Sequence, residues 1–80
     1  MSTPVLLDGF RICVYAPPRE HGPAHVHVLK DGAEVLIELA PVAVKEVRGK
    51  MKDADIVKAF RIVEEHTDVL ITEWRRLHGK

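Results

Sequence analysis

The sequence lacks a second cysteine, a net charge and any long apolar run. Cys13 is the single cysteine, which excludes an internal disulfide and a zinc ribbon. Its 12 basic residues are balanced by 12 acidic residues, which argues against bulk capture of DNA or of an anionic membrane. No segment approaches the roughly 18 apolar residues of a membrane helix, and the N-terminus does not resemble a signal peptide. We therefore expect one soluble cytoplasmic domain over residues 1–80, with no membrane partner.

Small size and missing motifs restrict the function further. A domain of 80 residues buries only roughly 60% of its unfolded surface, so its margin of stability is narrow. We therefore expect a homodimer or a small protein partner. No Walker loop, dinucleotide fingerprint, nucleophile elbow or HExxH motif occurs, so the sequence indicates no cofactor.

Two segments, 10–15 and 25–30, alternate apolar and polar residues as strands do. Pro17-Pro18 ends the first strand, because proline cannot donate to a strand ladder. A third strand follows the second one directly. The apolar side chains that these three strands present to one face are Phe10, Ile12, Val14, Val26, Val28, Val35 and Ile37.

Asp31-Gly32 is the strongest local signal. A type I′ turn needs positive φ at both central residues, and Asp-Gly supplies it. A two-residue turn pairs Lys30 with Ala33. The register that follows places Val28 opposite Val35, Val26 opposite Ile37, His27 opposite Leu36 and His25 opposite Glu38.

The period becomes helical from Asp53 to His78. Apolar residues recur there at alternating spacings of four and three, which predicts one amphipathic helix of about seven turns. Its length of about 39 Å exceeds the roughly 20 Å of a six-residue strand, so it should extend past the sheet. Ile62 and Val69 lie off its main stripe, where a partner could cover them.

These elements predict an α+β fold, with a three-stranded antiparallel sheet packed against one long C-terminal helix. We interpret residues 41–52 as a connector that could contain a short strand or turn. A sheet with one helical layer leaves its second face open. The polar side chains on that face are Arg11, Tyr15, His25, His27, Glu34 and Glu38.

Four interpretations of this polar face remain open. The first is a solvated surface, which solubility alone requires. The second is a metal site at the His25-Val26-His27 pair, completed by His21, Glu34 or Glu38. In the third, His25 and His27 exchange protons with RNA, while Arg11 or a lysine stabilises the phosphorane charge. In the fourth, His25 forms a structural bridge to Glu38 across the hairpin.

Motifs spread over nearly the whole chain resemble a known family of small bacterial and archaeal proteins. The most specific part has the pattern P-x-H-V-H-V. The residues that carry the resemblance are Asp8-Gly9-Phe10-Arg11, His21-Gly22-Pro23-Ala24-His25-Val26-His27-Val28, Leu39-Ala40-Pro41, Arg48-Gly49, Ile62-Val63-Glu64-Glu65-His66 and Trp74. The family is domain of unknown function four-one-six-zero. The chain departs from it at Ala24, where members commonly carry a second proline.

The resemblance implies a component of a toxin–antitoxin pair. The strand histidine also looks like that of small mRNA-cleaving toxins of the HicA type, an analogy about the site alone. We therefore expect an RNA-acting toxin or its protein-binding counterpart. The expected catalytic residues are His25 and His27, supported by Arg11, Tyr15 and Glu38. The alternatives are a non-catalytic module that binds a second small protein and a metal-binding domain.

Overall fold

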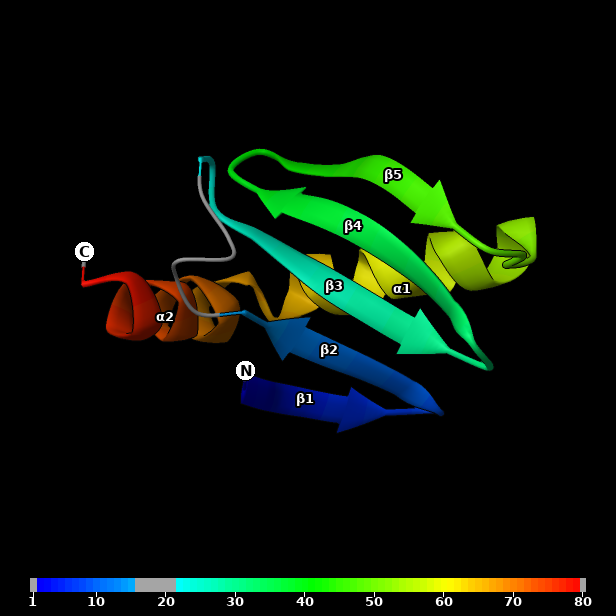
Figure 1. Ribbon diagram of the computed structural model, residues 1–80, viewed down its shortest axis with the longest axis horizontal. Helices are drawn as coiled ribbons and strands as arrows, with labels where there is room; N and C mark the ends of the chain where they lie inside the picture. Colours follow the sequence, from blue (N-terminus) through cyan, green and yellow to red (C-terminus); the bar gives the residue numbers. More distant parts are fainter. Residues whose placement is uncertain (1, 16–21, 80) are drawn as a thin grey trace.

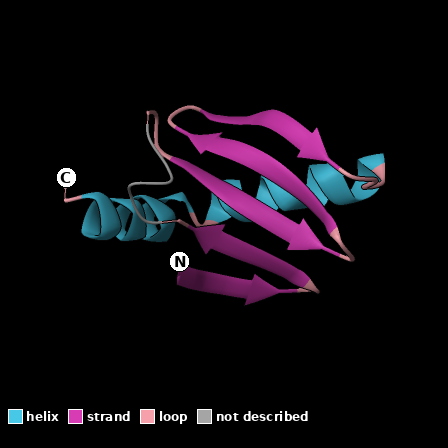
Figure 2. Ribbon diagram, viewed as in Figure 1, coloured by secondary structure: helices cyan, strands magenta, loops and turns pink. Residues whose placement is uncertain are grey.

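Five strands form one antiparallel sheet, and two helices cover one of its faces (Figures 1 and 2). The computed structural model describes residues 2–15 and 22–79, so Pro17-Pro18 and His21 lie outside the described residues. The elements follow the chain as β1 (Ser2–Leu7), β2 (Phe10–Val14), β3 (His25–Lys30), β4 (Ala33–Leu39), β5 (Val42–Arg48), α1 (Asp53–Glu65) and α2 (Thr67–His78). The α+β class holds, but the prediction of three strands and one long helix is wrong.

The hairpin of β3 and β4 has the predicted register. Asp31 and Gly32 have φ values of 50° and 81°, as the type I′ turn requires. Lys30 pairs with Ala33, and the remaining pairs follow without a shift as far as His25 opposite Glu38. The valines of both strands therefore share the helix-covered face, and the two histidines start from the other face.

Strand β1 was absent from the prediction. It pairs with β2 through a second Asp-Gly turn, in which Asp8 and Gly9 have φ values of 53° and 81°. The pairing shifts by one residue between Ser2 and Val5, around Pro4. This irregularity hides the alternation in a short segment, and it tolerates a proline because β1 is an edge strand.

Strand β5 occupies most of the segment interpreted as a connector. Ala40-Pro41 joins β4 to β5, with Leu39 opposite Val42. The register then shifts between the pairs Ile37–Val44 and Leu36–Glu46, so β5 contains one extra residue. Because of this bulge, the valines at 42, 44 and 47 all share the helix side of the sheet, although their spacing breaks the period of two.

The helical segment is interrupted at His66, whose φ and ψ are −114° and 20°. Side chains satisfy the carbonyls at this point. His66 Nδ1 donates to the Ile62 carbonyl at 2.8 Å, and Thr67 Oγ1 lies 3.0 Å from the Val63 carbonyl and 2.9 Å from that of Glu64. Such side-chain bonds compete with the regular backbone ladder. Hydrophobic periodicity does not register the break, because both helices present apolar residues to the same sheet.

The two helices divide the sheet between them. α1 contacts β4 and β5, while α2 contacts β1, β2 and β4. Ile62, which the sequence placed off the main stripe, is buried at 4% exposure, whereas Val69 is 52% exposed. Figure 1 shows α2 extending past the ends of β1 and β2. Neither helix, within the described ranges, is long and apolar enough to cross a membrane.

An ion pair on α2 also ties the start of β1 to the helical layer. Arg76 donates to both carboxylate oxygens of Glu73, from Nε at 2.9 Å and from Nη2 at 2.5 Å. The hydrogen bonds from Arg76 have the largest effect on the pKa of Glu73, and a hydrogen bond from the Ser2 side chain has the next largest. Together they lower this pKa from 4.5 to about 2. The carboxylate therefore remains ionised in the folded protein at pH values where it would be protonated in the unfolded chain.

Replacing a core side chain of α2 should destabilise the fold far more than replacing its exposed neighbour. Leu70 has 0% exposure, so Leu70→Ala leaves a cavity and should lower the free energy of unfolding by about 2–5 kcal/mol. Val69→Ala, at a site that is 52% exposed, should change it by no more than about 0.5 kcal/mol. Urea unfolding followed by circular dichroism measures both, and equal losses would contradict the packing of α2.

The Glu73 pair should contribute a small pH-dependent stabilisation. Because the folded pKa is depressed, the contribution is fully present above pH 4.5 and is lost as the pH falls toward about 2. Glu73→Gln should therefore lower the melting temperature at neutral pH, by an amount that shrinks across that acid range. Thermal unfolding of wild type and variant at several pH values tests this, with exposed Glu64→Gln as the control. A pH-independent difference would contradict the assignment.

Candidate functional site

His27 and Glu34 form the centre of the open face. His27 is only 5% exposed, and its Nδ1 is hydrogen bonded to a carboxylate oxygen of Glu34. A carboxylate can only accept, so Nδ1 carries the proton. In the neutral ring the basic lone pair then lies on Nε2. Strand pairing explains the contact: Leu36 is opposite His27, and Glu34 is its diagonal neighbour on the same face.

His25 lies at the beginning of β3, where the sheet ends. Its Nδ1 donates to the carbonyl of Pro23 at 2.9 Å, so its neutral ring also keeps the basic lone pair on Nε2. The centres of the His25 and His27 rings are 5.4 Å apart. His25 is partly exposed, so it is the more accessible of the two imidazoles.

A series of ring contacts connects these histidines with α2. Tyr15 meets His27 edge to face at 4.4 Å between ring centres, and the His25 ring lies 5.1 Å from that of Trp74. Trp74 stacks on His78 at 3.7 Å, and His78 Nε2 donates to the Tyr15 carbonyl at 2.9 Å. The contacts therefore form a closed circuit around the end of the sheet. They hold His25 between the open face and the helical layer.

Charged side chains of β4 and β5 lie next to the hydrogen-bonded pair of His27 and Glu34. Arg48 Nε donates to Glu46 at 2.7 Å, and Arg48 Nη1 lies 4.0 Å from Glu34. The hydrogen bond from Arg48, with its positive charge, lowers the pKa of Glu46 below 4.5. Arg48 also lies near Glu34, so its positive charge offsets the negative charge of the carboxylate that bonds to His27.

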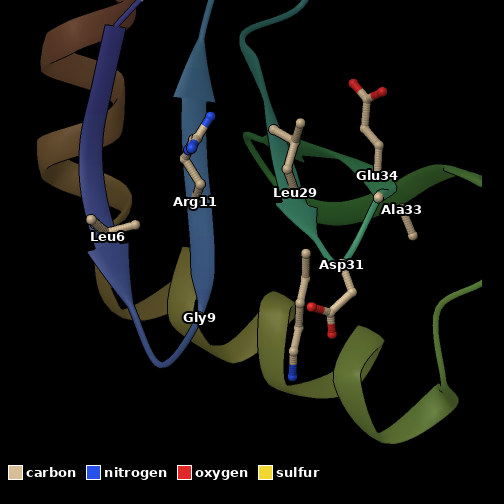
Figure 3. Close-up of a pocket in the computed structure, with 9 residues that line it drawn as sticks. Leu6, Gly9, Arg11, Leu29, Asp31, Ala33 and Glu34 are labelled. Atoms are coloured by element: carbon tan, nitrogen blue, oxygen red, sulfur yellow. The ribbon is translucent and has the colours of Figure 1, made fainter.

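Arg11 occupies a different part of the open face. It pairs across the strands with Leu29, four residues along β3 from His25, which corresponds to about 13 Å. A shallow hollow of about 360 Å³ surrounds it near the two Asp-Gly turns (Figure 3). The residues lining this hollow are Leu6, Gly9, Arg11, Leu29, Lys30, Asp31, Gly32, Ala33 and Glu34.

The structure thus brings together three of the five residues expected from the sequence, namely Tyr15, His25 and His27. Arg11 is displaced along the sheet. Glu38 is opposite His25 in the register, but its carboxylate lies 3.4 Å from Lys45 Nζ, while His25 Nδ1 bonds to Pro23.

The described part of the open face does not supply a ready metal site or an accessible thiol. Among residues 2–15 and 22–79, no group of three histidine, cysteine, aspartate or glutamate side chains is placed to hold a metal ion. His21, named in the metal interpretation, lies outside the described residues. Cys13 is 1% exposed, with Sγ 3.7 Å from Thr3 Oγ1.

Two partners of the histidines were not predicted from the sequence. Glu34 was placed on the correct face but not beside His27, although the diagonal relation in the register contained that information. Trp74 was interpreted as core packing, and it is 9% exposed. Its contact with His25 had no sequence signal, because it depends on where α2 crosses the end of the sheet.

Comparison with known proteins agrees with the resemblance seen in the sequence. No curated protein and no solved structure matches the chain. A family profile does match, over residues 9–75, which include His25, His27 and the strand β3 that carries them. The chain belongs to the family described as Domain of unknown function (DUF4160).

Proposed function

We propose that the chain is the RNA-acting component of a toxin–antitoxin pair and cleaves RNA without a metal ion. The observation that carries this proposal is the hydrogen bond between His27 Nδ1 and the Glu34 carboxylate, beside a second imidazole at 5.4 Å. A carboxylate that holds one nitrogen of a histidine fixes the tautomer and orients the other nitrogen for proton transfer.

The chemistry needs two proton transfers. One imidazole removes the proton of the ribose 2′-hydroxyl, and O2′ attacks the adjacent phosphorus. The bond from phosphorus to O5′ breaks, and the second imidazole, initially protonated, gives its proton to O5′. The products are a 2′,3′-cyclic phosphate and a 5′-hydroxyl, so no water, metal or redox partner is consumed.

His25 and His27 have unequal positions in this scheme. His25 is partly exposed at the beginning of β3 and meets the RNA first. His27 lies behind it, and its contact with RNA is confined to the part of its ring that stays exposed. Tyr15 packs against His27 and limits its rotation.

Purified protein should cleave a short RNA in the presence of EDTA, leaving 2′,3′-cyclic phosphate ends. His25→Gln and His27→Gln should each lower the rate by about 10²–10⁴-fold, because each removes a proton-transfer group. His66→Gln, at the break between the helices, is the matched control and should cleave at the parental rate. Gel analysis of end-labelled RNA measures the rates, and circular dichroism verifies folding.

Two results would contradict the proposal. Folded His25→Gln and His27→Gln proteins that retain parental cleavage would show that the histidines do no chemistry. Wild-type protein that neither cleaves RNA nor slows bacterial growth when expressed would remove the toxin role altogether.

A second candidate function is a non-catalytic module that binds a small protein. It is favoured by a second hollow, of about 390 Å³, between α1 and the turn that joins β1 to β2. Two of its lining side chains are exposed hydrophobics, Val57 at 51% and Leu7 at 40%. Exposed apolar side chains in a concavity are typical of protein contact sites.

If this hollow binds the partner, the product of the neighbouring gene should co-purify with wild-type protein. Val57→Asp places a charge in the hollow and should abolish the complex. Val69→Asp is the matched control, since Val69 is equally exposed at 52% but lies on α2. A complex that survives Val57→Asp, or a monodisperse monomer in the presence of that gene product, would contradict this function.

A further inference from the structure

The hollow around Arg11 combines a cation with exposed apolar surface. Leu6 is 73% exposed, and Leu29 stands partly exposed on the other side of Arg11. Figure 3 shows the side chains of Leu6, Arg11, Leu29 and Glu34 projecting from four strands toward the same side of the sheet. A ligand placed here would touch a guanidinium and two leucines at once.

The charges around the hollow leave Arg11 available for an anion. Glu34 is bonded to His27 and lies near Arg48, and Lys30 is paired with Asp55 at 3.2 Å on the helix side. Arg11 is exposed and makes no ion pair with any residue of the described ranges. Asp31 adds a negative charge at the turn. One cation close to an acidic rim favours a ligand with a single phosphate group over a polyanionic tract.

The hollow lies at some distance from the two histidines along β3, but one residue borders both places. Arg11 faces Leu29, which lies two residues from His27 and four from His25, or about 7 and 13 Å along β3. Arg11 therefore does not share a phosphate with His25. Glu34 joins the two places, because it lines the hollow and also holds His27.

We infer that this hollow binds the nucleotide next to the cleaved bond, with its phosphate on Arg11 and its base against Leu6 and Leu29. The inference rests on the proposed RNA cleavage, and it changes the role of Arg11 from stabilising the transition state to positioning the substrate. A volume of about 360 Å³ lies within the range of small-ligand sites. Apolar side chains hold bases by their faces with little dependence on sequence.

Binding can be measured without cleavage by using a short RNA whose 2′-hydroxyls are methylated, which removes the nucleophile. Its affinity for wild-type protein should fall about tenfold in Arg11→Gln and severalfold in Leu6→Ala. The slope of log affinity against log salt should decrease in magnitude by about 0.7 in Arg11→Gln, the value for one phosphate contact on a single strand. Arg61→Gln is the matched control, because Arg61 is an exposed arginine on α1 and does not line the hollow around Arg11.

The kinetic constants KM and kcat show whether Arg11 positions the substrate or acts in the chemical step. With cleavable RNA, Arg11→Gln should raise KM about tenfold and leave kcat within about twofold, and Arg11→Lys should recover part of the loss. An Arg11→Gln variant that lowers kcat at unchanged KM would overturn the inference, because Arg11 would then act at the cleaved phosphate.

The failure of this inference and the failure of the proposed function give different results. Unchanged RNA affinity and KM in Arg11→Gln, with cleavage intact, would overturn only the nucleotide site. Tight, Arg11-dependent binding of the methylated RNA by a protein that cleaves nothing would overturn only the cleavage. Affinity lost equally in Arg61→Gln would reduce the binding to general electrostatics and overturn the site.

Discussion

The turn at Asp31-Gly32 sets the pairing of β3 with β4, and the candidate site depends on that pairing. With Lys30 opposite Ala33, the valines of both strands are directed to the helices and the histidines to the other face. A slip of one residue would exchange the two faces and place His27 in the apolar core. The two positive φ values at this turn are therefore a requirement of the site as much as of the hairpin.

The open face is more constrained than a solvated surface would be. His27 is 5% exposed, so its polar nitrogens need partners, and the Glu34 carboxylate supplies one of them. Leaving a buried polar group unpaired costs about 1–3 kcal/mol, so this pair also contributes to stability. Arg48 then lies beside Glu34, and Glu46 beside Arg48. The buried imidazole of His27 is therefore the first member of a series of polar contacts that runs through Glu34 and Arg48 to Glu46 on the edge strand β5.

Local patterns predicted the central hairpin and its polar face, and they missed what depends on irregular pairing. The register from His25 to Glu38 follows from a two-residue turn and strict alternation. Strands β1 and β5 each contain a register shift, which breaks the period of two that would have revealed them.

The break in the helical layer could not be predicted from the apolar pattern either. The break at His66 arises from side-chain hydrogen bonds at that residue and at Thr67, which leave the apolar pattern unchanged. Contacts between distant elements had no local signal at all. The ring contact between His25 and Trp74 exists only because α2 crosses the end of the sheet.

Glu34 fixes the tautomer of His27, on which the candidate site depends, and nitrogen NMR of the imidazole rings measures this tautomer directly. At about pH 9, where an ordinary histidine is neutral, His27 should carry its proton on Nδ1 in the wild-type protein. Glu34→Ala should shift His27 toward the Nε2-protonated form, while Glu38→Ala should leave it unchanged. A wild-type His27 protonated on Nε2 would contradict the account.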